Sequence, residues 1–132
     1  MSKEQILYTS EITDLGEKVP ELLEGKMFIP FADFAPDELK PICVCHTHLK
    51  APHFKFREND YVRVGEQCML IKEVGWEVMM TMREMGHCTV RYYDSKTEER
   101  PENLLPGVIL CDYSGDLQFN IGDKFEIIRI KD

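Results

Sequence analysis

Residues 61–74 read Tyr-Val-Arg-Val-Gly-Glu-Gln-Cys-Met-Leu-Ile-Lys-Glu-Val, and this stretch indicates the fold of the chain. Runs of apolar and β-branched side chains, each with the length of a strand, lie on both sides of Gly65-Glu66. Glycine accepts a positive φ and the neighbouring acid stays in solvent, which suits a tight turn between antiparallel strands. We therefore predict strands over residues 61–64 and 67–74, joined by a hairpin corner.

Short segments of the same kind recur along the rest of the chain. They are rich in β-branched and aromatic residues, and most are bounded by Gly, Pro, Asn or Asp. Gly122-Asp123 is predicted as a second hairpin corner. The fold class is therefore mainly β, with further strands over residues 5–12, 26–31, 41–48, 88–93, 107–111 and 124–130.

Two regions depart from the strand pattern. Residues 76–85, from Trp76 to Met85, place apolar side chains at helical spacing, and Gly86 follows as the residue expected to end a helix. We predict this segment as the principal α-helix, with its methionines packed on the core. A shorter helical turn is expected within residues 13–24 around Pro20, and residues 94–106 are expected to form a surface loop.

The composition is that of one globular domain, which we expect to span residues 1–132. Sixteen Lys and Arg stand against 24 Asp and Glu, a formal charge of −8, and 43% of the residues are hydrophobic. This charge excludes a general attraction to nucleic acid or anionic lipid and favours a basic partner. The sequence has neither a signal-like start nor a long apolar run, and it has five cysteines, so we expect a cytoplasmic protein with reduced thiols. Three of these thiols, at Cys68, Cys88 and Cys111, are expected inside strands as small buried residues.

Residues 40–57 concentrate the chemistry of the sequence. They hold three of the four histidines, two of the five cysteines, four cations and no acid. On a strand, His46 and His48 share one face with Val44, whereas Cys43, Cys45 and Thr47 share the other. Two opposite faces cannot close one tetrahedral metal site, so we predict no bound metal, although a site built on His46 and His48 with an outside ligand stays open.

The face with the two histidines suits an anion. Imidazoles at positions i and i+2 of a strand stand about 7 Å apart and can flank one phosphate-sized group. A neutral imidazole is a competent nucleophile near neutral pH, and phosphoryl transfer depends on positioning and charge stabilisation more than on acid–base groups. Thr47 and Lys50 supply a hydroxyl and a cation nearby.

A longer series of motifs resembles a known family, the glucitol/sorbitol-type enzyme IIA of the bacterial sugar phosphotransferase system. The resemblance runs from about Tyr8 to Ile130. Its motifs are Met27-Phe28-Ile29-Pro30-Phe31, Ala35-Pro36-Asp37-Glu38-Leu39, Cys43-x-x-His46-x-His48, Val74-Gly75, Arg83-Glu84-Met85-Gly86-His87-Cys88-Thr89-Val90-Arg91-Tyr92 and Phe119-Asn120-Ile121-Gly122-Asp123-Lys124-Phe125. The resemblance implies a small closed or nearly closed β-barrel of six or more short strands with one principal helix.

The family also implies an activity, that of a phosphotransferase component without a cofactor. His46 would be the phosphoacceptor and His48 would stabilise the phosphoryl group, with Thr47, Lys50 and His87 around them. The phosphoryl group would come from the carrier protein HPr and pass to a IIB component for sugar uptake, which associates the chain indirectly with the membrane IIC component. A homodimer is possible under this resemblance. We expect both imidazoles to open onto a concave surface, with His46 exposed.

The chain departs from the family pattern after His48. Leu49-Lys50-Ala51-Pro52-His53-Phe54 stands where the family has Gly and a polar loop. Two alternatives to phosphoryl transfer therefore stay open. One is a small zinc- or anion-binding module that uses His46 and His48, and the other is a regulatory relative that keeps the fold without transfer.

Overall fold

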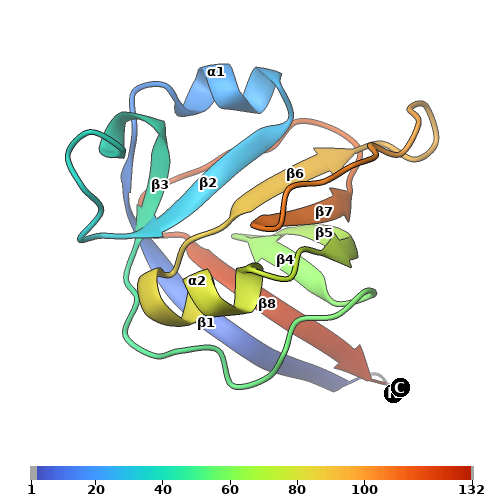
Figure 1. The fold of residues 1–132 in the computed structure, drawn as a ribbon, viewed down its shortest axis with the longest axis horizontal. Helices are drawn as coiled ribbons and strands as arrows, with labels where there is room; N and C mark the ends of the chain where they lie inside the picture. The colour runs from blue at the N-terminus through green and yellow to red at the C-terminus, as the bar shows by residue number, and fades with distance from the viewer. Residues whose placement is uncertain (1–2, 132) are drawn as a thin grey trace.

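The computed structural model describes residues 3–131. Its strands and helices alternate irregularly along the chain, and the strands are short except for the first (Figure 1). In chain order the elements are β1 (Lys3–Leu15), α1 (Val19–Glu24), β2 (Met27–Ala32), the 3-10 helix η1 (Lys40–Ile42), β3 (Cys43–His46), β4 (Tyr61–Val64), β5 (Gln67–Val74), α2 (Val78–Met85), β6 (Thr89–Tyr93), β7 (Val108–Asp112) and β8 (Lys124–Lys131).

The eight strands form a closed ring in the order β1-β3-β2-β6-β7-β5-β4-β8. Two neighbouring pairs, β2–β3 and β6–β7, are parallel, and the others are antiparallel. The ring closes where β8 pairs with β1, which leaves no open edge in the barrel. The prediction of a mainly β, closed or nearly closed barrel of six or more strands with one principal helix is confirmed.

The hairpin at residues 61–74 has the predicted bounds. Val64 pairs with Gln67 across the turn, and Gly65 adopts φ +59° there. The second predicted corner is wrong as a hairpin. Gly122 does adopt φ +97°, but the turn only leads into β8, because residues 113–123 form no strand that could pair across it.

The strand predicted over residues 41–48 is shorter in the structure. Pro41 lies in η1, where its fixed φ suits a tight helical turn, and β3 ends at His46. Thr47 still donates its backbone N–H to Glu11, but His48 lies beyond the strand. The predicted alternation holds within β3: Val44 belongs to the main core, whereas Cys43 and Cys45 pack in a second cluster against Phe31, Ala32 and Ala35.

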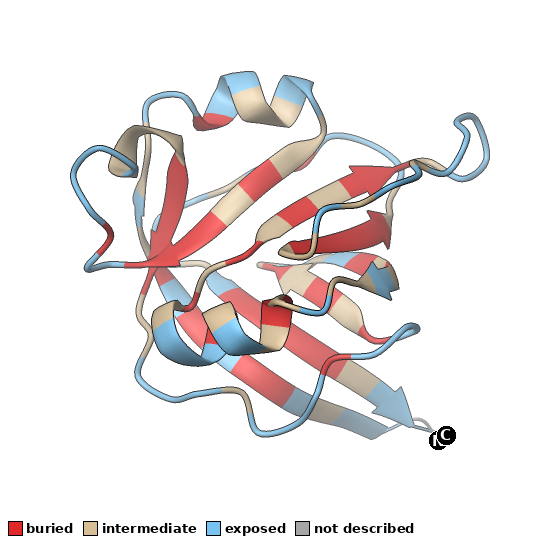
Figure 2. Cartoon of the chain, viewed as in Figure 1, coloured by how far each residue is buried: buried red, intermediate tan, exposed pale blue. Residues whose placement is uncertain are grey.

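The predicted principal helix is present as α2, which begins two residues later than expected, at Val78. Val78 and Met82 are fully buried in the main core, as the helical spacing predicted. The shorter turn is present as α1, with Pro20 in its first turn, and residues 94–106 form a loop. Figure 2 shows that the strands carry most of the buried residues. No helix within residues 3–131 is long and apolar enough to cross a bilayer.

The cysteines are all unpaired, but they differ in burial. Cys88 and Cys111 are buried in the core, as expected. Cys68 is exposed, so its predicted burial is wrong. The alternation along β5 places its neighbour Met69 inward and therefore turns Cys68 to the outer face.

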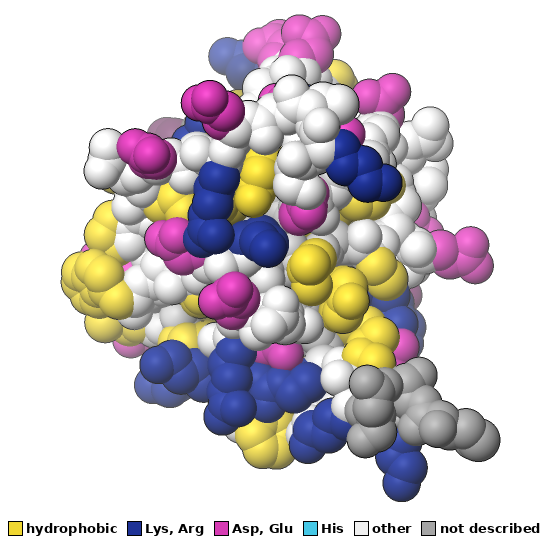
Figure 3. Space-filling model, turned by 90° about the vertical axis from the view of Figure 1, so that its right-hand side faces the viewer, with side chains coloured by type: hydrophobic (Ala, Val, Ile, Leu, Met, Phe, Trp, Pro, Cys, Tyr) yellow, Lys and Arg dark blue, Asp and Glu magenta, His cyan; other side chains and the backbone are white. Residues whose placement is uncertain are grey.

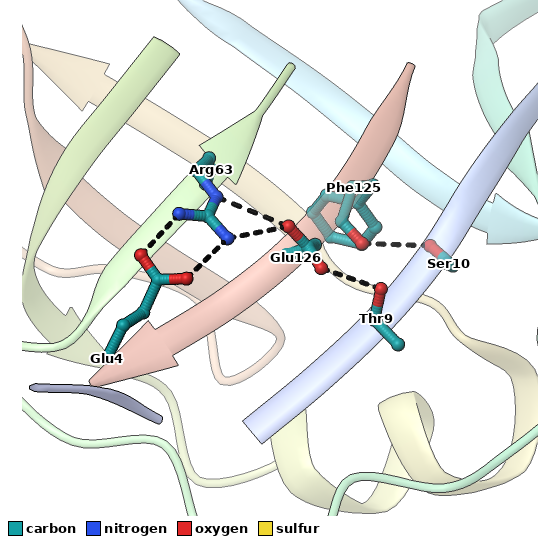
Figure 4. A network of polar contacts seen from close by, with 6 residues as sticks. All are labelled: Glu4, Thr9, Ser10, Arg63, Phe125 and Glu126. Atoms are coloured by element: carbon teal, nitrogen blue, oxygen red, sulfur yellow. Dashed lines mark hydrogen bonds and ion pairs between the residues drawn. The ribbon is translucent and has the colours of Figure 1, made fainter. Parts of the chain in front are cut away.

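A polar network ties together three neighbouring strands of the barrel (Figure 4). Arg63 on β4 donates to both carboxylate oxygens of Glu4 and to Oε1 of Glu126 on β8, with N···O distances of 2.6–3.2 Å. Thr9 on β1 donates to Oε2 of Glu126 at 2.7 Å. Because Glu126 is buried, these partners satisfy a carboxylate that would otherwise be strongly destabilising. The network fixes β1 against β8 next to Phe125.

Candidate functional site

The rings of His46 and His48, called here the imidazole pair, meet at one hydroxyl group. The Tyr8 Oη lies 2.8 Å from Nδ1 of His48 and 3.5 Å from Nδ1 of His46. Tyr8 comes from β1, His46 ends β3 and His48 follows it, and β1 and β3 are paired neighbours in the ring. The two rings therefore meet at Tyr8, although His48 lies beyond β3 and not, as was predicted, on the same strand as His46.

The other nitrogen of each ring faces a backbone carbonyl at the C-terminal end of α2. Nε2 of His46 lies 2.7 Å from the Gly86 oxygen, and Nε2 of His48 lies 2.9 Å from the Arg83 oxygen. The last carbonyls of a helix lack partners within the helix, so they are free to accept these hydrogen bonds. The negative end of the helix dipole also favours positive charge on the two rings.

Gly86 allows this approach because it has no side chain. It adopts φ +57°, and a Cβ placed on it would lie 2.8 Å from Cε1 of His46 and 3.1 Å from Cγ of His48. The conformation is the left-handed one that glycine favours at the end of a helix, and it turns the chain into β6. One glycine therefore both ends α2 and makes room for the imidazole pair.

The expectation that His46 is exposed on a concave surface is wrong. His46 is 0% exposed, since Gly86 approaches it on one side and Phe125 packs against its ring with centroids 5.1 Å apart. Burial lowers the pKa of His46 below its ordinary value, against the opposing effect of its hydrogen bonds to the Gly86 and Thr47 carbonyls. His46 is thus neutral near pH 7. His48 is partly exposed and forms the outer member of the pair.

Thr47 and Lys50 line a groove that includes Tyr8 but neither His46 nor His48. Thr47 Oγ1 accepts the Glu11 N–H at 3.0 Å, which fixes the end of β3 to β1. Lys50 is exposed and lines a groove of about 590 Å³ together with Thr47 and Tyr8. The groove thus reaches the tyrosine that joins the two rings.

His87 and His53 lie apart from the pair. The His87 ring faces the carbonyl oxygen of Pro30 at 3.1 Å and packs on Phe31, so it anchors the segment after α2 to β2. His53 is exposed, and its backbone N–H is bonded to Leu7. Within residues 3–131, no group of three or more His, Cys, Asp or Glu side chains could hold a metal ion.

The imidazole pair occupies one side of the molecule. In Figure 1 the C-terminal end of α2 lies on the left. Figure 3 shows the face on the opposite, right-hand side, where basic, acidic and apolar side chains mix and no histidine is visible.

Sequence reasoning missed three contributors to this site. Tyr8 and Phe125 were indistinguishable from core aromatics, because their alternation signals only burial. Gly86 was predicted as the end of the helix, but its contact with residues 40 positions earlier in the chain needs the tertiary structure. Tyr8 had one usable signal, since it is a polar-tipped residue at an inward-facing strand position.

Fold and site together define a small β-barrel protein in which two imidazoles are hydrogen-bonded to backbone carbonyls at the C-terminal end of a helix. The sequence model of one family, the PTS system glucitol/sorbitol-specific IIA component, matches residues 7–126. The chain belongs to this family of phosphotransferase system (PTS) components.

Relatives and a solved structure agree with this assignment. The chain is 27% identical over 121 residues to the PTS system glucitol/sorbitol-specific EIIA components of Shigella flexneri and Escherichia coli strain K12, covering 80% of this chain and 93% of each relative. The crystal structure of a PTS system IIA component from Enterococcus faecalis V583 has the same fold. Its TM-score is 0.77 at 20% identity, over 89% of this chain and 97% of that one.

Proposed function

We propose that this chain is a phosphocarrier that accepts a phosphoryl group from phosphorylated HPr on His46 and passes it to a IIB component. The observation that carries the proposal is the imidazole pair, in which each Nε2 meets a backbone carbonyl and each Nδ1 turns to the same hydroxyl. Membership in the IIA family supports HPr and IIB as the two partners.

The hydrogen bonds indicate which nitrogen reacts. A carbonyl oxygen only accepts, so the nitrogen that faces it must carry the ring proton. In His48, Nε2 is therefore protonated and Nδ1 keeps its lone pair. In His46 both nitrogens face carbonyl oxygens, Nε2 that of Gly86 at 2.7 Å and Nδ1 that of Thr47 at 3.2 Å, and the shorter contact places the single proton of the neutral ring on Nε2. The Tyr8 hydroxyl has one proton, which it donates to Nδ1 of His48 at 2.8 Å. Nδ1 of His46, 3.5 Å away, keeps the less engaged lone pair and is the nucleophile.

The end of α2 suits the product of this transfer. The donor N–P bond breaks, its electron pair returns to the donor imidazole, and Nδ1 of His46 forms the new N–P bond. The Nε2 proton stays on the ring, which then carries positive charge next to the Gly86 carbonyl. A charge-assisted hydrogen bond and the helix dipole both stabilise that charge.

His48 has two tasks in this proposal. Because His46 is fully buried and His48 is the more exposed ring of the pair, the proposal requires the His48 ring to move aside before the donor can approach in line. It lies in a segment, residues 47–60, that has neither helix nor strand, so the backbone permits such a movement. Once displaced, the ring moves its Nε2–H from the Arg83 carbonyl to a phosphoryl oxygen, and Lys50 adds positive charge at the groove. Thr47 and His87 position the neighbouring backbone.

The test is incubation with phosphoenolpyruvate, enzyme I and HPr, followed by intact mass measurement at alkaline pH, which preserves phosphohistidine. We expect His46→Ala to accept no phosphate. His48→Ala should accept it about 10²-fold more slowly, the effect of losing one electrostatic donor. His53→Ala removes an exposed ring outside the pair that lines the same groove as Lys50, so it reports whether a histidine other than the pair takes part.

Each other outcome has a defined meaning. Labelling of His46→Ala with none on His48→Ala would exchange the two roles. Labelling of both would place the phosphoryl group on another residue, with His53 and His87 next to test. A folded wild-type protein that accepts no phosphate would refute the carrier function and favour a regulatory relative.

A further inference from the structure

We propose that Tyr8 is a catalytic residue that moves one hydrogen bond from His48 to the incoming phosphoryl group. In the unphosphorylated protein its hydroxyl holds His48 over His46, and during transfer the same hydroxyl donates to a phosphoryl oxygen. This inference rests on the proposed phosphocarrier function and extends it to a residue outside the histidine motif.

Packing fixes the position of the Tyr8 hydroxyl. Tyr8 is 3% exposed, and its ring lies edge-on to His46 and Phe125, with centroid distances of 6.1 Å and 6.0 Å. The ring of His48 lies 5.8 Å away on the outer side. A donor held in this way loses little entropy when it binds the reacting group, which is the condition for effective electrostatic stabilisation.

The hydroxyl can serve only one acceptor at a time. Burial raises the pKa of Tyr8 well above its ordinary value, so the group remains a protonated donor throughout the neutral range. Its single proton lies toward Nδ1 of His48, 2.8 Å away. Nδ1 of His46 lies 3.5 Å from the same oxygen, so a phosphoryl group on that nitrogen would place its oxygens next to the hydroxyl.

The exchange balances without any transfer of a proton. The Tyr8 proton stays on its oxygen while the hydrogen bond passes from Nδ1 of His48 to a phosphoryl oxygen. His48 is then held only by the bond from its Nε2–H to the Arg83 carbonyl, so its ring becomes free to turn and to pass that N–H to a phosphoryl oxygen. The same event that stabilises the phosphoryl group therefore releases the ring that covered His46.

Tyr8→Phe tests the proposal because it removes only the hydroxyl and keeps the ring packing. We expect phosphoryl acceptance from HPr at saturating donor to fall about 10²-fold, with little change in the concentration of HPr that gives half the maximal rate. Tyr92→Phe is the matched control. Tyr92 is also buried, and its hydroxyl meets only the Leu23 carbonyl at 3.5 Å.

A second measurement does not depend on the rate of phosphoryl transfer. In ¹⁵N NMR spectra, Nδ1 of His48 should resonate as a hydrogen-bonded acceptor in the unphosphorylated protein and shift toward the free pyridine-type position on phosphorylation. The same shift should appear in unphosphorylated Tyr8→Phe and not in Tyr92→Phe. This readout still decides whether Tyr8 holds His48 if the Tyr8 variant is poorly folded, because wild-type protein provides it.

The outcomes separate this inference from the carrier function. Wild-type rates in Tyr8→Phe, or a His48 resonance that ignores both the variant and phosphorylation, would overturn the role of Tyr8. Absence of phosphate on the wild-type protein would overturn the carrier function. It would also overturn the proposed transfer of the Tyr8 hydrogen bond from His48 to the phosphoryl group. In that case the resonance in Tyr8→Phe would still decide the resting hydrogen bond.

Discussion

Gly86→Ala places a methyl group where the imidazole pair approaches the end of α2. The new Cβ would lie 2.8 Å from Cε1 of His46 and 3.1 Å from the ring of His48, and the backbone there adopts φ +57°. Real Cβ atoms do not approach to 2.8 Å, and neither ring can withdraw while it keeps its hydrogen bond to the helix end. The variant must therefore strain the backbone and also displace the histidines.

Both contributions to the loss of stability can be given a magnitude. A non-glycine residue in the left-handed region costs about 1–2 kcal/mol. Overfilling a packed site costs about 1–3 kcal/mol more. The free energy of unfolding should therefore fall by about 2–5 kcal/mol, and phosphoryl acceptance should fall by about 10²-fold, because a displacement of about 1 Å has that effect on transfer.

Gly65→Ala separates the two contributions. Gly65 has a similar φ of +59°, but its added Cβ would meet only the end of the flexible Asp123 side chain, at 3.1 Å. Thermal unfolding of Gly65→Ala should show the backbone loss alone, and Gly86→Ala should melt about 4–12 °C lower than this control. In a double variant, His46→Ala should relieve part of the loss caused by Gly86→Ala. Equal melting temperatures for the two glycine variants, or no relief in the double variant, would refute the close contact.

Three further predictions concern pH, the polar network and the thiols. Because burial lowers the pKa of His46 in the folded state, the unfolded state binds more protons near pH 6, so stability should decline as pH falls below about 6.5. Melting temperatures from pH 8 to pH 5 check this, and His46→Gln with the wild-type slope would contradict it. Glu126→Gln should lower the free energy of unfolding in urea by about 1–3 kcal/mol, since Arg63 and Thr9 lose a charged acceptor, and should leave phosphoryl acceptance unchanged. Burial raises the pKa of Cys88 to about 12, so iodoacetamide should modify the exposed Cys68 first. Mass spectrometry identifies the modified thiols, and early modification of Cys88 or Cys111 would count against the core packing.

Local patterns in the sequence predicted the fold wherever a pairing is itself local. The hairpin of residues 61–74 has its predicted bounds because the turn and both strands lie in one short segment. The parallel pairs β2–β3 and β6–β7 could not be predicted in this way, since long connections bring their strands together. Gly122-Asp123 correctly predicted a turn in the chain. A turn motif does not show whether strands lie on both sides of it, and here only β8 follows.

The candidate site was predicted only in part for a related reason. Strand alternation placed His46 and His48 on one side, and that depends on neighbouring residues alone. The cover over His46 comes from the end of α2 and from Phe125 on β8, which lie far away in the sequence. The sequence therefore identified the two imidazoles but neither the burial of His46 nor the tyrosine that contacts both rings.

The pairing of β8 with both β1 and β4 also determines when a growing chain can acquire its site. Residues 124–131 leave the ribosome after every other strand of the barrel, and until then β1 and β4 have unpaired edges. Phe125 in this last strand packs against the His46 ring, and Glu126 supplies the carboxylate between Arg63 and Thr9. A nascent chain that lacks β8 therefore has both histidines but not their packed surroundings, and the site is completed only by the final, long-range step of folding.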